Sequence, residues 1–133
     1  MPFLIDTDVA IHLRDGDTAT KRLTRTLAER PFLSIITVVE LEGGVYANPA
    51  ISEKRRQALD LLLSHSPILD LGLEIAGAYG TIIEQTGFSR RKISDRMIAA
   101  TALVHDLTLV TFNGRDFRDV PDLKLLEWER PAA

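Results

Sequence analysis

Acidic residues stand where the apolar runs of this chain end. The first run reads FLIDTDV over residues 3–9, so Asp6 and Asp8 follow three apolar residues that are typical of a buried strand. Three further acids hold comparable places, each past an apolar run or at the start of an apolar helix: Glu40, Asp95 and Asp116. Because the carboxyl ends of parallel strands share one edge of a sheet, these side chains can meet in a single cleft.

Such a meeting of negative charges requires a cation. Two carboxylates ~5 Å apart at an effective dielectric of about 20 repel by roughly 3 kcal/mol, and several together raise one another's pKa. A divalent ion reverses the sign of that interaction, and oxygen ligands without sulfur favour Mg²⁺ or Mn²⁺, as one or two ions. We therefore predict a catalytic metal site formed by Asp6, Glu40, Asp95 and Asp116. Asp6 and Asp95 are the expected direct ligands, and the other two bind through water.

Each acid taken alone also has a structural explanation. Asp6 suits a hydrogen bond to the start of the next helix, and Asp8 suits a helix N-cap. Residues 37–40 read TVVE, a capping box in which the glutamate folds back onto the threonine N–H. Asp95 suits a helix N-terminus, where a negative charge meets the positive end of the dipole, and the fourth acid suits an ordinary loop. The metal interpretation rests on four acids at four equivalent positions.

Weaker signals surround these acids. Thr111 and Asn113 follow an apolar run and can orient the acids, although the Asn-Gly pair there also reads as a plain turn. A basic run just before Asp95 can hold RNA phosphates or form a solvated loop; it consists of Arg90, Arg91 and Lys92. The three histidines are expected at the surface rather than at a metal: His12, His65 and His105.

Strands and helices must alternate to position these residues. Apolar runs predict strands over residues 3–7, 30–37, 66–71, 107–112 and 123–128. Helical spacing predicts helices over residues 18–30, 38–47, 52–64, 73–86 and 96–107, the fourth stopped by Gly87 and the last capped by Ser94 or Asp95. The last four residues are expected to fray. This alternation favours a three-layer α/β/α sandwich around a mostly parallel sheet of about five strands.

Composition limits the alternatives. The 133 residues predict a single domain over residues 1–133, and 45% hydrophobic residues suffice for a core. The net charge of −3 does not indicate a general nucleic-acid binder, so contact with a polyanion requires local basic residues or a bound cation. Cysteine is absent, which is compatible with the cytoplasm, where we expect the protein. Neither a signal peptide nor a transmembrane segment is expected.

Four stretches resemble the motifs of PIN domains, and in particular of the VapC-type toxins of prokaryotic toxin–antitoxin pairs. They read LIDTDV, TVVELEGGV, SDRMIAATAL and LVTFNGRDF, in the family's order, and the resemblance extends from Phe3 to about Trp128. The family's acids match Asp6, Glu40, Asp95 and Asp116, with Thr111 and Asn113 in supporting positions. Glu40 rather than Glu42 is the match, because only Glu40 begins the family's E-L-x-x-G pattern. Asp8 stands where the family often has Asn or Asp.

The resemblance implies a metal-dependent endoribonuclease. Such proteins form homodimers and are blocked by a cognate VapB-like antitoxin, whose tail often brings a basic residue into the acidic cleft. Metal-activated water would cut RNA to leave 5′-phosphate and 3′-hydroxyl ends.

Three other functions stay open. The chain can be a PIN-domain nuclease that processes RNA without being a toxin, or a PIN module that binds RNA or protein without cutting. The D-x-D start over Asp6 and Asp8 also resembles haloacid dehalogenase-like phosphatases. That family needs threonine or valine at the fifth motif position, where this chain has Ala10, and a late acidic pair that is not found here.

Overall fold

Parallel strands form the centre of the fold in the computed structural model, which describes residues 2–132. The strands are β1 (Phe3–Ile5), β2 (Leu33–Ser34), β3 (Ile68–Leu69), β4 (Thr108–Thr111) and β5 (Leu125–Glu127). The order β1-β4-β5 makes one sheet and β2-β3 a second one, all pairs being parallel. A single parallel bridge between Leu4 and Phe32 connects the two. The prediction of one five-stranded sheet is therefore wrong in this detail, because β2 and β3 pair over only two residues each.

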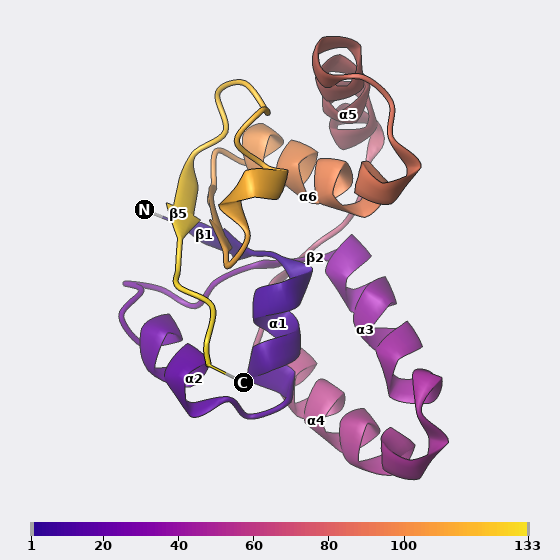
Figure 1. Ribbon diagram of the computed structural model, residues 1–133, viewed down its shortest axis with the longest axis vertical. Helices are drawn as coiled ribbons and strands as arrows, with labels where there is room; N and C mark the ends of the chain where they lie inside the picture. Colours follow the sequence, from indigo (N-terminus) through magenta and orange to yellow (C-terminus); the bar gives the residue numbers. More distant parts are fainter. Residues whose placement is uncertain (1, 133) are drawn as a thin grey trace.

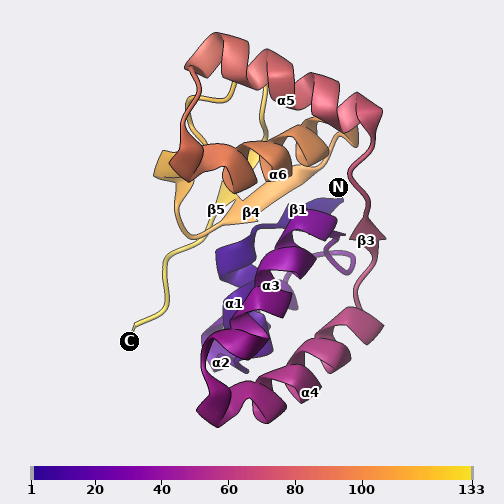
Figure 2. The same ribbon diagram turned by 90° about the vertical axis from the view of Figure 1, so that its right-hand side faces the viewer.

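The three-layer α/β/α architecture is confirmed. Helices α5 (Leu73–Thr86) and α6 (Ile93–Val104) lie on one side of the sheet, and α1 (Thr7–Arg14), α2 (Thr18–Thr24), α3 (Ile35–Ala47) and α4 (Ser52–Ser64) lie on the other (Figures 1 and 2). Alternate residues of each strand face opposite layers. Leu4 and Leu109 pack toward α5 and α6, whereas Ile5 and Val110 pack toward α1, α3 and α4. The two cores fix the register of β1 against β4.

Helix bounds follow the sequence pattern where the helix carries its own periodic apolar face. The predicted helices 52–64 and 73–86 match α4 and α5, and Gly87 ends α5 with a positive φ of 90°. The predicted helix 18–30 is too long, since α2 stops at Thr24. Three short 3₁₀ turns complete the elements: η1 (Pro49–Ile51), η2 (Arg90–Lys92) and η3 (Gly114–Asp116).

Three predicted helix starts are wrong. Ser34 caps α3 by accepting the Ile36 N–H at 3.1 Å, so the TVVE stretch lies inside the helix and forms no capping box. Asp6 rather than Asp8 caps α1, accepting the Val9 N–H at 3.0 Å. Helix α6 begins at Ile93 without a side-chain cap, so neither Ser94 nor Asp95 serves as its N-cap. Glu40 and Asp95 are thereby left without a capping role.

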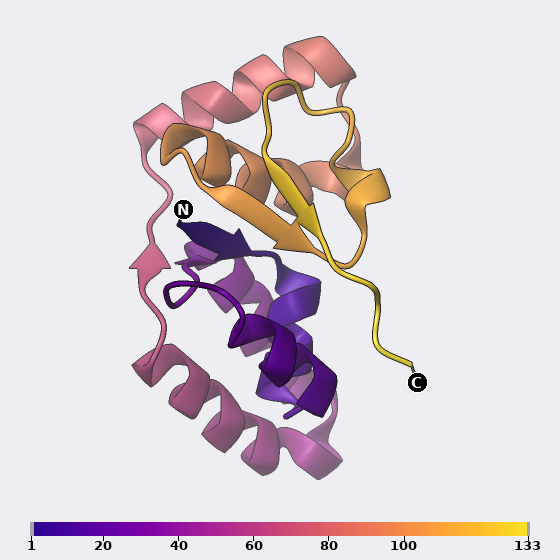
Figure 3. The ribbon, with the colours of Figure 1, turned by 90° about the vertical axis from the view of Figure 1, so that its left-hand side faces the viewer.

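The segment after β5 returns toward α1 and α2 (Figure 3). Trp128 is buried, and its backbone N–H donates to the Thr111 carbonyl at 2.9 Å. Arg130 forms an ion pair with Asp8, so the expectation that the chain frays from residue 130 is wrong for Arg130; Ala133 lies outside the described residues. Among residues 2–132, no helix is long and apolar enough to span a membrane.

Candidate functional site

Four acidic side chains come from four separate elements. Asp6 follows β1 and is buried, and Asp116 ends the η3 turn beyond β4. Asp95 lies in the first turn of α6, and Glu40 lies in the second turn of α3 with an exposed side chain. Since β1 and β4 are parallel neighbours, the first two acids leave the sheet at the same edge.

The pKa of Asp95 responds to the other three acids. The pKa of Asp95 is raised to about 6. Burial is the largest cause, and the negative charges of Asp116, Asp6 and Glu40 follow in that order. Arg96 opposes the shift. Three carboxylates can act together on a fourth only when all lie near it, because charge interactions fall with distance and screening. Asp116, Asp6 and Glu40 therefore lie near Asp95, and a shared metal site of the four acids stays a prediction.

Asp6 is the most buried of these acids. Burial raises its pKa to about 6, against hydrogen bonds from the Thr111 hydroxyl and the Val9 N–H that lower it. The neighbouring charge of Asp8 raises the pKa and that of Arg130 lowers it. The carboxylate thus carries two roles in this fold, because it caps α1 with Oδ1 and points Oδ2 at Thr111.

A chain of hydrogen bonds connects Asp6 with Asp116. The Thr111 hydroxyl donates to Asp6 Oδ2 at 2.6 Å and accepts the Asn113 N–H at 2.9 Å. The side-chain amide of Asn113 donates from Nδ2 to Asp116 Oδ2 at 2.5 Å. The two polar residues singled out in the sequence are in direct contact with the acids they were expected to orient.

Gly114 lies against the end of the Glu127 side chain. A Cβ atom at position 114 would collide with the carboxylate of Glu127, so a larger residue there requires that flexible, 43% exposed side chain to move. Asn113, the other residue of the pair, holds Asp116. The Asn-Gly pair is therefore both a tight turn and the support of an acid.

A second hydrogen-bond chain, which the sequence reasoning missed, holds Glu40. Thr7 donates to Glu40 Oε1 at 2.6 Å, and the Thr7 and Thr37 hydroxyls lie 3.0 Å apart. Because the Thr7 proton points to Glu40, Thr37 must donate to Thr7. Thr37 is fully buried, so this chain is anchored in the core. The only sequence signal was the hydroxyl of Thr7 between two aspartates.

An ion pair between a buried arginine of α6 and a half-exposed aspartate just after η3 was also missed. The guanidinium of Arg96 donates to both carboxylate oxygens of Asp119, at 2.8 and 2.7 Å. It also contacts the Asp116 carbonyl at 3.4 Å. Arg96 directly follows Asp95 in α6. Its contacts therefore fix the segment that contains Asp116 to the helix that contains Asp95.

Asp8 belongs to a cluster at the rim of the site. The His12 ring donates from Nδ1 to the Asp8 carbonyl at 2.8 Å and meets Phe112 edge-on, with centroids 5.1 Å apart. Arg130 pairs with Asp8 Oδ2 at 2.5 Å and lies 5.9 Å from the Phe112 ring centroid. His12 is therefore half-buried in this cluster, whereas His65 and His105 are exposed as predicted.

The basic run lies in η2, directly before α6. Arg90 and Arg91 are exposed and Lys92 is half-buried. Lys92 is close enough to Asp119 to lower the pKa of that carboxyl. The role of this run in RNA binding stays a prediction.

The donor set fits a divalent cation in chemistry. Carboxylate and hydroxyl oxygens surround the site, and mutual repulsion already raises the pKa of one acid. Within residues 2–132, however, no three acidic or histidine side chains are drawn together tightly enough to hold a metal ion as they stand. Three of the four carboxylates are instead held by donors of their own, Thr7, Thr111 and Asn113.

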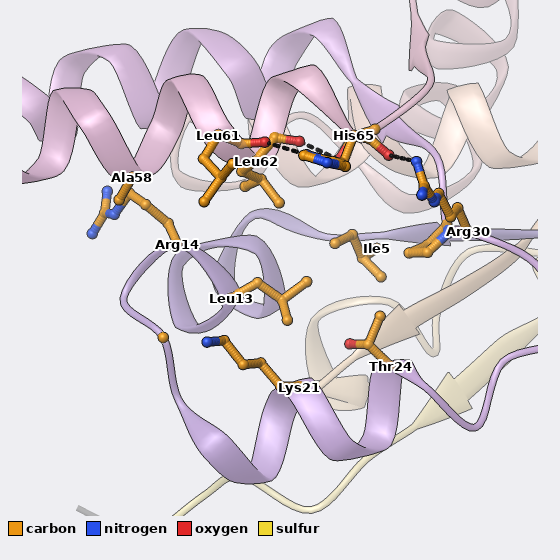
Figure 4. A pocket seen from close by; sticks show the side chains of 13 residues that line it. Ile5, Leu13, Arg14, Lys21, Thr24, Arg30, Ala58, Leu61, Leu62 and His65 are labelled. Carbon is orange, nitrogen blue, oxygen red and sulfur yellow. Dashed lines mark hydrogen bonds between the residues drawn. The ribbon is translucent and has the colours of Figure 1, made fainter.

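A cavity of about 390 Å³ lies away from these acids, between α1, α2 and α4 (Figure 4). Leu61 and Leu62 of α4 point toward Leu13 of α1 across it. Cationic side chains stand around this apolar centre: Arg14, Lys21 and Arg30. The cavity thus differs in chemistry from the acidic site.

The sequence is similar to known ribonucleases. A model of the PIN domain matches residues 3–123. The Ribonuclease VapC of Rickettsia bellii is 30% identical over 131 residues, which cover 95% of this chain and 96% of that protein. The Ribonuclease VapC1 of Haemophilus influenzae (strain R2866) is 27% identical over 135 residues, covering 98% of this chain and all of that protein.

Solved structures of toxin–antitoxin complexes share the fold. A chain of VapBC2 from Rickettsia felis, bound to a DNA fragment from its promoter, superposes with a TM-score of 0.83 at 26% identity, over 97% of this chain and 100% of that one. A chain of VapBC-1 from nontypeable Haemophilus influenzae gives a TM-score of 0.77 at 25% identity, over 98% and 100%.

Proposed function

This chain belongs to the PIN domain family, and from that premise we propose that it is a metal-dependent endoribonuclease, the toxin of a type II toxin–antitoxin pair. The observation that carries the proposal is the convergence of Asp6, Glu40, Asp95 and Asp116 at the carboxyl ends of β1 and β4. Relatives named Ribonuclease VapC along nearly the whole chain supply the substrate class and the toxin role.

The four acids hold Mg²⁺ or Mn²⁺ in this proposal, as one or two ions. When bound, such an ion supplies positive charge that makes a water more acidic and offsets charge on the phosphoryl oxygens. Asp6 and Asp95 are the proposed direct ligands, because burial shields both carboxyls from solvent. Glu40 and Asp116 would hold the ion through water.

The chain's own residues orient these groups. Thr111 fixes Asp6 Oδ2 by its hydrogen bond, and the Thr37–Thr7 pair holds Glu40. Attack of water on phosphorus breaks the bond to the 3′ oxygen and leaves 5′-phosphate and 3′-hydroxyl ends. Burial around Asp6 limits water and strengthens each of these polar contacts.

A VapB-like antitoxin is the proposed protein partner, and the protein works as a homodimer. Structural neighbours are VapBC complexes, which supports that partner class. The cavity between α1, α2 and α4 suits an apolar side chain flanked by acidic residues, because its centre is apolar and its rim cationic. We assign this cavity to the antitoxin rather than to RNA, since it lies away from the acids.

The test is cleavage of RNA by the purified chain. Cleavage in Mg²⁺ or Mn²⁺ is expected, with loss in EDTA and in Asp6→Asn and Asp95→Asn. Asp106→Asn is the matched control, because Asp106 is an exposed acid that pairs with Lys124 on the surface. Undiminished cleavage in EDTA, or by Asp95→Asn, contradicts the proposal.

A housekeeping nuclease is the second candidate, since the same site serves it. Growth arrest on expression, relieved by Asp95→Asn and by co-expression of the adjacent gene, supports the toxin. Cleavage without growth arrest supports RNA processing instead.

A further inference from the structure

The carboxyl-terminal segment brings one cation to the rim of the acidic site. The backbone N–H of Trp128 donates to the Thr111 carbonyl at 2.9 Å. The centroids of the Trp128 and Phe112 rings lie 6.4 Å apart. Thr111 is the residue whose hydroxyl binds Asp6. The backbone is therefore anchored beside the site only two residues before Arg130.

Arg130 is held in place on two sides. Its guanidinium lies 5.9 Å from the Phe112 centroid, and one Nη atom lies 2.5 Å from Asp8 Oδ2. Stacking on an aromatic ring restricts an arginine without using its N–H donors, of which the guanidinium has five. The positive charge is close enough to Asp6 to oppose the rise of that acid's pKa.

Arg130 differs from the other cation at this site in its accessibility. Arg96 acts on Asp95, but its side chain is only 3% exposed and is fixed on both oxygens of Asp119. The side chain of Arg130 is 52% exposed and forms one ion pair. Only the second of these arginines can meet a ligand from solution.

An RNA strand must approach several carboxylates of a chain whose net charge is −3. Repulsion between phosphate and carboxylate opposes that approach. A guanidinium at the rim can exchange a carboxylate partner for a phosphate, or bind both through different N–H groups, because its planar fork matches either anion. The geometry points to Arg130 as the residue that binds a backbone phosphate of the RNA beside the acids. This inference rests on the proposed function.

The test is RNA binding by the full chain in an Asp95→Asn background, which prevents turnover. A short fluorescent single-stranded RNA of mixed sequence is titrated in Mg²⁺ over a series of salt concentrations. Arg130→Gln is expected to raise Kd about tenfold and to reduce the slope of log K against log salt by about 0.7, the loss of one phosphate contact to a single strand. Arg130→Lys is expected to keep most of the slope.

Lys124→Gln is the matched control. Lys124 is 49% exposed and pairs with Asp106 at 2.8 Å, away from the four acids. The substitution therefore removes the same charge as Arg130→Gln, from a comparable surface ion pair. The control is expected to leave Kd and slope unchanged. Equal values for Arg130→Gln and Lys124→Gln overturn the inference.

Asp8→Asn separates phosphate binding from a merely structural role. It removes the ion pair but leaves the cation, so RNA binding is expected to stay or to tighten. If Asp8→Asn weakens RNA binding as much as Arg130→Gln does, Arg130 only positions Asp8 and the inference is wrong. Loss of antitoxin binding with unchanged RNA binding in Arg130→Gln also overturns it.

The inference and the proposed function fail in different ways. Cleavage of RNA by the wild-type chain, with Arg130→Gln indistinguishable from the control, removes the inference alone. A wild-type chain that neither binds nor cleaves RNA removes both.

Discussion

The Thr111 hydroxyl donates a 2.6 Å hydrogen bond to the Asp6 carboxylate across a separation of 105 residues. The two residues follow neighbouring parallel strands, so the sheet itself brings them together. Both are buried. This contact makes the charge of Asp6 tolerable inside the fold, because a buried carboxylate needs hydrogen-bond donors.

Thr111→Val tests this contact. Removing the hydroxyl is expected to raise the pKa of Asp6 above about 6, because the hydrogen bond favours the ionised form. The acid limb of the pH–rate profile for RNA cleavage should move upward, with a loss of about tenfold near neutral pH. Thr101→Val is the control, since Thr101 is equally buried but binds only the Met97 carbonyl of its own helix. An unmoved acid limb contradicts the assignment.

Asp95→Asn is expected to stabilise the protein near neutral pH. The pKa of Asp95 is raised from 3.8 to about 6 on folding, so its contribution to stability is present below about pH 4 and is lost as pH rises to about 6. Asn removes that ionisation. The variant should gain about 1–2 kcal/mol at about pH 7.5, after allowance for solvent screening, and nothing at about pH 4. Urea melts at the two pH values measure the difference.

Asp119→Asn is expected to act with the opposite sign. The hydrogen bonds from Arg96 lower the pKa of Asp119 from its ordinary value of 3.8. The stability that ionised Asp119 contributes is therefore present above pH 3.8 and is lost as the pH falls through the lowered pKa. The variant leaves a buried guanidinium without its charge partner, at a cost of about 1–2 kcal/mol near neutral pH after allowance for the 47% exposure of Asp119. The double variant Arg96→Met/Asp119→Leu should recover much of that loss. No recovery would mean that the pair is not the cause.

Part of this site follows from the sequence alone. Apolar runs that end in Asp6 and Thr111 predict two strands, and parallel strands bring their carboxyl ends to one edge. The periodic apolar faces of α4 and α5 predict both helices with their bounds. These features are local, so a short stretch of residues contains the information.

The remaining features depend on contacts between distant residues. Residues 35–39 (IITVV) favour a strand by propensity, yet Ser34 caps a helix there and Leu41 and Val45 bury its apolar face. Thr7 meets Glu40 across 33 residues, and Arg96 meets Asp119 across 23. No local pattern distinguishes such a threonine or arginine from a solvent-exposed one. Packing of the three layers decides which hydroxyl and which guanidinium supports an acid.

Divalent ions are expected to stabilise the protein in a pH-dependent way. Binding to the folded state alone adds about 2.7 kcal/mol at a free concentration of about 100 Kd. Since Asp6 and Asp95 both have a pKa of about 6, protons compete with the ion below that pH. Mg²⁺ or Mn²⁺ should therefore raise the melting temperature at about pH 7.5 and have little effect at about pH 5. Calorimetry without heat, and an unchanged melting temperature, would argue against the metal site.

Leu61→Glu is expected to separate partner binding from catalysis. Leu61 is 64% exposed and lines the cavity between α1, α2 and α4. A carboxylate there replaces apolar surface, and it repels the acidic partner residues that Lys21 and Arg30 at the edge of the cavity would attract. Co-purification with the antitoxin should be lost, whereas RNA cleavage and the melting temperature should be unchanged, because an exposed side chain adds little to folding.

Leu73→Glu is the control for that variant. Leu73 is 90% exposed at the start of α5, on the opposite side of the sheet from the cavity. It should retain the antitoxin, since the same change of charge is placed on a different layer. Equal loss in both variants would indicate a general effect of charge, and retention in both would place the antitoxin elsewhere. Loss in Leu61→Glu alone assigns the cavity to the partner and leaves the acidic edge of the sheet to RNA.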